Sequence, residues 1–132
     1  MHLENLNFFK KELFYSLIEK NEKFYINIMS VDDLKVGKRG LTEEEKKNGL
    51  ILVFSNTSYK NLTSDDEFLY CNMRFSGLWE EIVIPIYAIH IFFDDIYNPN
   101  FLFRFRFEEK KEKSKPDEKS SKINKTILKV VK

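Results

Sequence analysis

Residues 68–89 read FLYCNMRFSGLWEEIVIPIYAI, and this stretch decides the fold. From Phe68 to Phe75 the side chains follow the two-residue period of a β-strand, rich in aromatic and apolar residues. A tight turn follows, because Gly77 can adopt the positive φ that such turns require. Another strand is predicted at Ile82–Pro85, and the proline marks a bend into the next strand, Ile89–Phe93. The stretch therefore predicts consecutive strands joined by short connections.

Further strands are predicted on both sides of this stretch. The same two-residue period occurs at Phe24–Met29 and at Leu50–Phe54. Residues 30–49 are predicted to form a loop that holds a short helical turn capped by Thr42. A last strand is predicted at Phe101–Phe107, with one aromatic face and one mostly cationic face. Such a series of short strands is typical of a small open barrel or of two packed sheets.

An amphipathic helix opens the chain. Its main apolar stripe, predicted to be buried, consists of Leu3, Leu6, Phe9, Leu13 and Leu17, spaced at three and four residues. Three more apolar residues stand beside this stripe, namely Phe8, Tyr15 and Ile18. This surplus predicts either a homodimer contact or a wider core-facing stripe.

Composition narrows the class of protein. The chain has 132 residues, with 22 Lys and Arg against 21 Asp and Glu, for a formal net charge of +1. Nucleic-acid-binding domains usually carry a basic excess, so nucleic acid is not the expected partner. Cys71 is the single cysteine, which predicts no disulfide, and with two histidines we expect no metal site and no cofactor. No segment approaches the roughly 20 apolar residues of a membrane span, and we expect a soluble, cytoplasmic protein.

Signals for catalysis are scarce. The chain has four glycines, and none are clustered to hold a phosphate group. Cys71 lies among apolar neighbours in a predicted strand, where a buried and inert thiol is the usual state. His90 is expected to be an outward-facing strand residue, and the acidic runs Asp65–Glu67 and Asp94–Asp95 are expected to be turn residues. The sequence therefore favours a protein that is not an enzyme.

The C-terminal region divides into two parts. Residues 108–126 are almost entirely charged or small and polar, so we predict a disordered linker that cannot bury enough apolar surface to fold. A linker of this length has an end-to-end distance of roughly 24 Å. The last residues, 127–132, read ILKVVK and form an apolar end on this linker. They are typical of a short docking motif, and the alternative is a frayed terminus. The predicted organisation is a domain at 1–107, a linker at 108–126 and a motif at 127–132.

One segment of the predicted domain has the features of a peptide-binding groove. Asn72 and Arg74 can hydrogen-bond to an extended ligand, while Met73 and Phe75 can contact its apolar side chains. The small turn residues Ser76 and Gly77 permit close backbone approach. The alternative interpretation is an ordinary hairpin turn.

Two motifs in the same order resemble the SspB family, the stringent starvation protein B adaptors of the ClpXP protease. The family has Arg-Phe-Gly-Gly where this chain has Arg74-Phe75-Ser76-Gly77, followed by a Val-Pro-x-x-Ala-Ile-like bend that residues 84–89 match. The family also ends in a Leu-Arg-Val-Val-Lys-like motif, which residues 128–132 match with one lysine-for-arginine exchange. Two departures are Ser76, in place of the first glycine, and Trp79, where many members have proline.

This resemblance implies a homodimeric, mostly β adaptor that binds SsrA-tagged polypeptides, the products of stalled ribosomes. It also suggests an association with the ribosome. The implied groove consists of Ile51, Leu52, Val53, Phe54, Asn72, Met73, Arg74, Phe75, Ser76 and Gly77. The implied docking site for the ClpX unfoldase consists of Ile127, Leu128, Lys129, Val130, Val131 and Lys132. The implied role is to tether tagged substrates to ClpXP, with no bond-making step.

Two other classes remain open from the residues alone. The first is a small Sm- or SH3-like barrel that binds RNA through the aromatic and cationic faces of residues 101–107. The near-zero net charge argues against it. The second is a structural dimerisation module in which the C-terminal motif has no role.

Overall fold

The structure, a computed structural model, describes residues 3–107. Its elements in chain order are α1 (Leu3–Lys20), β1 (Lys23–Ile28), β2 (Lys35–Val36), α2 (Glu43–Asn48), β3 (Leu50–Ser55), β4 (Tyr59–Ser64), β5 (Phe68–Phe75), β6 (Leu78–Pro85), the 3-10 turn η1 (Ile86–Ala88), β7 (Ile89–Phe93) and β8 (Leu102–Arg104). The predicted linker at 108–126 and the predicted motif at 127–132 lie outside the described residues. Neither α1 nor α2 has the length and apolar content of a membrane-spanning helix.

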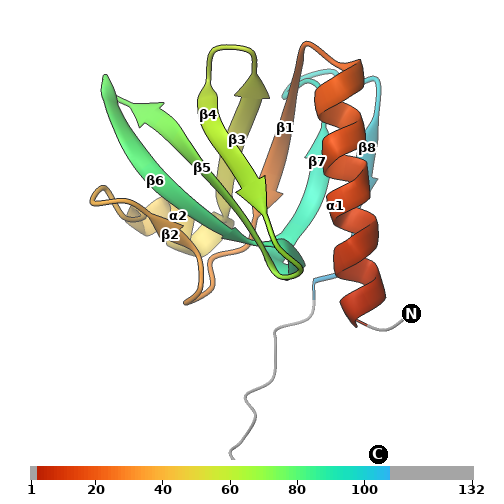
Figure 1. The fold of residues 1–132 in the computed structure, drawn as a ribbon, viewed down its shortest axis with the longest axis horizontal. Coiled ribbons are helices and arrows are strands. Elements are labelled where there is room, and N and C mark those ends of the chain that lie inside the picture. The colour runs from red at the N-terminus through yellow and green to blue at the C-terminus, as the bar shows by residue number, and fades with distance from the viewer. Residues whose placement is uncertain (1–2, 108–132) are drawn as a thin grey trace, which may run out of the picture.

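Within residues 3–107 the strands form two open antiparallel sheets, with α1 standing at one side of them (Figure 1). Sheet A has the strand order β3-β1-β7-β8, and sheet B has the order β2-β6-β5-β4. Within these residues the chain crosses between the sheets four times: from β1 to β2, from β2 to β3, from β3 to β4, and from β6 through η1 to β7. This architecture confirms the predicted mainly β fold with an N-terminal helix.

The core lies between the two sheets and α1, and it follows from the two-residue period of the strands. Alternate residues of β1, β3 and β5 are buried, including Ile26, Leu52 and Leu69. An aromatic cluster joins the helix to sheet A. The ring of Phe14 meets those of Phe24 and Phe54 edge-on, at centroid distances of 5.6 and 4.9 Å. Phe24 and Phe54 stack on each other at 5.7 Å, so α1, β1 and β3 share one packed contact.

The buried face of α1 coincides only in part with the predicted apolar stripe. Phe14 and Leu17 are buried as core residues, but Phe9 is 49% exposed, while Asn7 and Lys10 are buried. Of the other stripe members, Leu6 and Leu13 are half-buried, and the side chain of Leu3 is not described. The prediction was wrong because it placed Lys10 in solvent, whereas a lysine can bury its aliphatic stem along an apolar surface.

The last predicted strand is also corrected. β8 covers only Leu102–Arg104 and pairs with β7, so the strand is shorter than the predicted Phe101–Phe107. Phe105 and Phe107 pack against the core outside the strand, while Phe103 is 44% exposed. The aromatic residues of this segment therefore do not share one buried face.

Other local predictions are confirmed. β5 and β7 have the predicted bounds. Thr42 caps α2 through a capping box, since its hydroxyl accepts from the Glu45 N–H (3.1 Å) and the Glu45 carboxylate accepts from the Thr42 N–H (3.0 Å). β4 was not predicted. Its side chains are mostly exposed or half-buried, and Asn61 has a φ of 59°, where the pairing with β5 shifts register.

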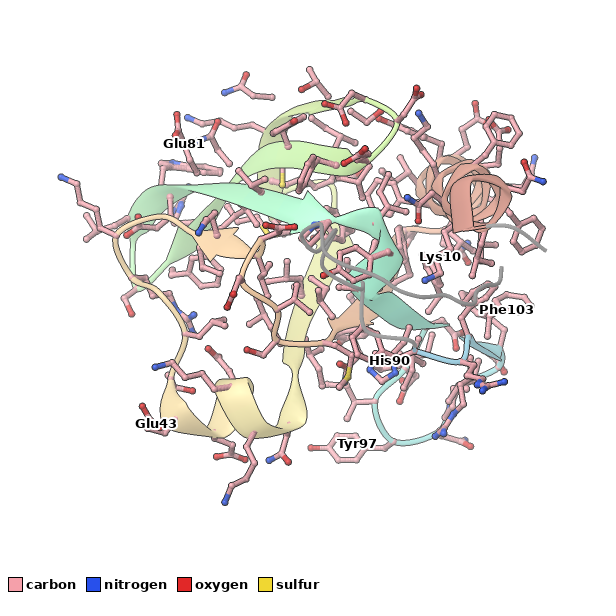
Figure 2. The ribbon with its side chains drawn as sticks, turned by 90° about the horizontal axis from the view of Figure 1, so that it is seen from below. Lys10, Glu43, Glu81, His90, Tyr97 and Phe103 are labelled. Atoms are coloured by element: carbon pink, nitrogen blue, oxygen red, sulfur yellow. The ribbon has the colours of Figure 1, made fainter. Side chains whose placement is uncertain are left out.

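Lys10 is the one cation in the described core. Its side chain is 1% exposed, and its ammonium donates to the Tyr87 carbonyl (3.1 Å) and lies 5.3 Å from the ring centroid of Phe105. In Figure 2, Lys10 points from α1 toward the end of sheet A, whereas Tyr97 and Phe103 lie at the periphery. Burial lowers the pKa of Lys10 from 10.5 to about 8.

Replacing Lys10 by methionine should stabilise the fold at neutral pH. The folded-state pKa lies below the unfolded-state value, so the cost of burying the charge is fully present below pH 8 and disappears as the pH rises toward 10.5. We expect Lys10→Met to raise the free energy of unfolding by about 1–2 kcal/mol at pH 7, with the gain shrinking toward pH 10. Urea denaturation from pH 7 to 10 measures the difference. Lys20→Met, in the last turn of the same helix, is the charge-matched control, and a gain independent of pH would contradict the assignment.

Candidate functional site

A cleft of about 350 Å³ lies between the edge strand β3 and the C-terminal end of β5. It is lined by Ile51, Leu52, Val53, Thr57, Ser58, Met73, Arg74 and Phe75. Two segments that are distant in sequence, and that were predicted to share one groove, thus meet at one cleft. In Figure 1 the ends of β5 and β6 splay away from β3 at this place.

The cleft exists because neither wall has a strand beside it there. β3 is an edge strand of sheet A and pairs with β1 alone in the described part of the chain. β4 covers the side of β5 only as far as the Tyr59–Met73 pair, so Arg74 and Phe75 continue past it, paired to β6. Two backbone edges therefore border the same opening.

The exposed edge of β3 carries unused backbone groups. Ser58 Oγ donates to the Val53 carbonyl (2.8 Å) and accepts from the Ser55 N–H (2.9 Å). These two bonds show that both backbone groups point away from β1. In an antiparallel ladder the N–H and C=O of alternate residues point to the same edge. Ile51 therefore directs both its backbone N–H and its C=O toward the cleft. Its side chain is 47% exposed.

Thr57 and Ser58 also line the cleft, and neither was predicted as a site residue. They belong to the connection between β3 and β4, which Ser58 closes with its hydroxyl and with an N–H bond to the Ser55 carbonyl (3.2 Å). The polar run Ser55-Asn56-Thr57-Ser58 indicates a turn, but only the packing of the two sheets shows that the turn borders the cleft.

The floor and one rim of the cleft are apolar and aromatic. Met73 is 4% exposed and belongs to the core as well as to the cleft. The guanidinium of Arg39 lies over the ring of Phe75 at 4.7 Å and also makes two bonds to the Glu45 carboxylate, at 3.0 and 2.7 Å. These bonds hold the pKa of Glu45 below its usual value and that of Arg39 above its own. The charge of Arg39 is thus matched within the protein.

The remaining residues assigned to the groove by sequence do not line the cleft. Phe54 is buried in the aromatic cluster, and Asn72 Oδ1 accepts from Asn61 Nδ2 (2.9 Å) on the neighbouring strand. Ser76 and Gly77 form the two-residue turn between β5 and β6, with φ values of 51° and 83°. Positive φ at both positions is typical of a type I′ hairpin, which explains why glycine suits this turn.

Cys71 is a buried thiol, and His90 is hydrogen-bonded to a side chain of the neighbouring strand β1. Burial raises the pKa of the Cys71 thiol to about 12, so it stays protonated at neutral pH. His90 is half-buried, and its Nε2 forms a hydrogen bond with Asn27 Oδ1 (3.0 Å). Burial, followed by the charges of Arg104 and Lys10, lowers its pKa. No group of three or more candidate metal ligands gathers within residues 3–107.

The acidic runs are turn residues, as predicted. Asp65 Oδ1 accepts from the N–H groups of Glu67 (2.9 Å) and Phe68 (2.8 Å). Asp94 and Asp95 accept in the same way from backbone N–H groups of residues 97–101. Each carboxylate therefore closes a local turn.

Fold and site together define a small two-sheet domain that leaves an open strand edge beside an apolar cleft. Comparison with protein families matches residues 12–129 to the family Stringent starvation protein B (SspB). The chain belongs to the SspB family, a family of adaptors rather than enzymes. A comparison with curated proteins returns no match. The family match covers all of β1–β8 and reaches Ile127, Leu128 and Lys129 of the C-terminal motif.

Proposed function

We propose that this protein is a cytoplasmic proteolytic adaptor that binds SsrA-tagged polypeptides in the cleft and delivers them to the ClpXP protease. Membership of the SspB family supports an adaptor role. The observation that carries the peptide-binding step is the open edge of β3, where Ile51 offers a backbone donor and acceptor beside an apolar floor. An extended peptide can add to such an edge as a further strand, with alternate side chains entering the cleft.

Delivery requires a second contact, which we assign to Ile127–Lys132 as the site for the ClpX unfoldase. Residues 108–126 would act as the tether between this motif and the domain at 1–107. A tethered substrate has a raised effective concentration at the unfoldase, so two weak contacts combine into a tight one. The SspB family match extends along the tether to residue 129, which supports this assignment.

The proposed adaptor is a homodimer, and the structure restricts the residues available for its interface. Of the three surplus apolar residues, Phe8 is 62% exposed, whereas Tyr15 and Ile18 pack partly against the core. Tyr15 also donates its hydroxyl hydrogen to Ser64 Oγ (2.9 Å). We therefore propose the interface around Phe8 and the 49% exposed Phe9. Association with the ribosome, where tagged chains arise, remains part of the proposal.

Replacing Ile51 by glutamine should weaken peptide binding while the fold is kept. The side chain lines the cleft and is half exposed, so the change removes apolar contact with the ligand more than core packing. We expect the dissociation constant of a fluorescein-labelled SsrA-tag peptide to rise about three- to tenfold in fluorescence anisotropy. Ile96→Gln, at a 52% exposed isoleucine outside the cleft, is the matched control. Equal affinity in both variants would place the groove elsewhere. Met73 is a poorer test site, because it is also a core residue.

Removing residues 127–132 should abolish stimulation of ClpXP degradation and leave tag-peptide affinity within about twofold, because the two contacts lie on separate parts of the chain. The measurements are the degradation rate of a tagged fluorescent protein and peptide anisotropy. A chain in which the six residues are replaced by a Gly-Ser segment of equal length is the control for linker length. Full stimulation of degradation by either altered chain would contradict the assignment of residues 127–132 as the docking site for ClpX.

Replacing Phe8 by lysine should convert the dimer to a monomer. A charge placed in a desolvated contact costs at least about 3 kcal/mol, or about two decades in the dissociation constant. Light scattering coupled to gel filtration at micromolar concentration measures the mass. Tyr97→Lys, at a 92% exposed aromatic residue, is the control for surface charge. A monomeric unaltered chain would contradict the dimer proposal.

A further inference from the structure

Trp79, the cross-strand neighbour of the cleft residue Arg74, has two cations over its ring. The ammonium of Lys60 lies 4.2 Å from the ring centroid, and the guanidinium of Arg74 lies 5.0 Å from it. The three side chains come from three neighbouring strands, since Arg74 pairs with Trp79 across β5 and β6, and Lys60 is on β4. Trp79 itself is 38% exposed, so this cluster is open to solvent.

The two cations in this cluster lack an acidic partner. Every ion pair among residues 3–107 involves other side chains, and Glu81, on the same outer face, pairs with neither cation. Arg39 provides the contrast, because it also lies on an aromatic ring but its charge is matched by Glu45. A cation held over a ring keeps hydrogen-bond donors for a ligand, and its side chain is already partly ordered. The cluster is thus suited to bind a carboxylate.

The position of Arg74 connects the cluster to the cleft, which Arg74 also lines. Along β5, Met73 is buried on the inner face and Arg74 is exposed on the outer face. A peptide added beside β3 would lie between this edge and the end of β5. A side chain of that peptide that faces β5 would meet Arg74, the residue through which the cleft borders the cluster.

We propose that Trp79, Lys60 and Arg74 form a subsite for an acidic side chain, Asp or Glu, of a polypeptide whose neighbouring residues occupy the cleft. This inference rests on the proposed peptide-binding function and adds a specificity determinant to it. The subsite selects negative charge at the peptide position that faces Arg74. Its contribution falls as ionic strength rises, because the cluster is exposed.

The test is a charge scan of the ligand. Fluorescein-labelled SsrA-tag peptides carrying Glu or Gln at one position at a time are titrated against the full chain at low and high salt. We expect a preference for Glu over Gln of about two- to tenfold at the peptide position that faces Arg74, reduced by salt. Lys60→Gln and Trp79→Leu should abolish this preference. Lys23→Gln removes an equivalent charge, 5.7 Å from the Tyr25 ring and away from the cleft, and should retain it.

The outcomes distinguish a failure of the proposed subsite from a failure of the proposed peptide-binding function. If the unaltered chain binds none of the peptides, both the function and the subsite are overturned. If peptides bind and Ile51→Gln weakens them, but Lys60→Gln keeps the preference for Glu, only the subsite is overturned. A uridine oligoribonucleotide that displaces the peptide from the unaltered chain but not from Trp79→Leu would also overturn it, by identifying a nucleic-acid surface. Lys60 is exposed, so its variant provides the result even if Trp79→Leu does not fold.

Discussion

The packing of Phe14 against Phe24 and Phe54 fixes β3, and the site depends on this strand being fixed along one side only. Phe54 anchors β3 to the helix and to β1, while the ladder with β1 satisfies one backbone edge. The other edge stays open at Ile51. Open edges are ordinarily a liability that proteins cover or shorten. Here the hydrogen bonds of Ser58 close the turn after β3, and the chain then continues into β4 of the other sheet. The opening that results has an apolar floor and a cationic rim.

Much of the fold follows from local periodicity, and the errors arise where tertiary packing overrides it. β5 and β7 were predicted at their observed bounds; the alternation of β5 is uninterrupted, whereas the burial of β7 does not alternate strictly. β4 was missed because Asn61 breaks the alternation on an edge strand that buries little. The helix face was misassigned because Lys10 is buried through its aliphatic stem, which composition alone does not reveal. Residues 101–107 alternate as a strand does, yet most of their aromatic rings contact the core from outside the ladder.

The candidate site, like the fold, was predicted from the sequence only in part. Motif resemblance assigned Ile51 and Met73 to one groove, and the structure brings both to one cleft. Resemblance did not separate Ile51, which lines the cleft, from Phe54, which is buried, because side-chain direction depends on the pairing of β3 with β1. Ser58 carries no recognisable signal, since its role comes from closing a turn between two sheets. Trp79 was visible only as a departure from the family pattern, and its two cationic neighbours come from other strands.

The most direct test of the central claim is site-resolved amide hydrogen exchange of Ile51, with and without saturating SsrA-tag peptide. In the free protein this N–H faces the cleft and should exchange rapidly, whereas the amides of Leu50 and Leu52 point toward β1 and should be protected. Addition of the peptide as a new strand predicts strong protection of Ile51 and little change at Leu50 and Leu52. A peptide that binds fully while Ile51 continues to exchange as in the free protein would contradict the claim that the open edge of β3 holds the substrate.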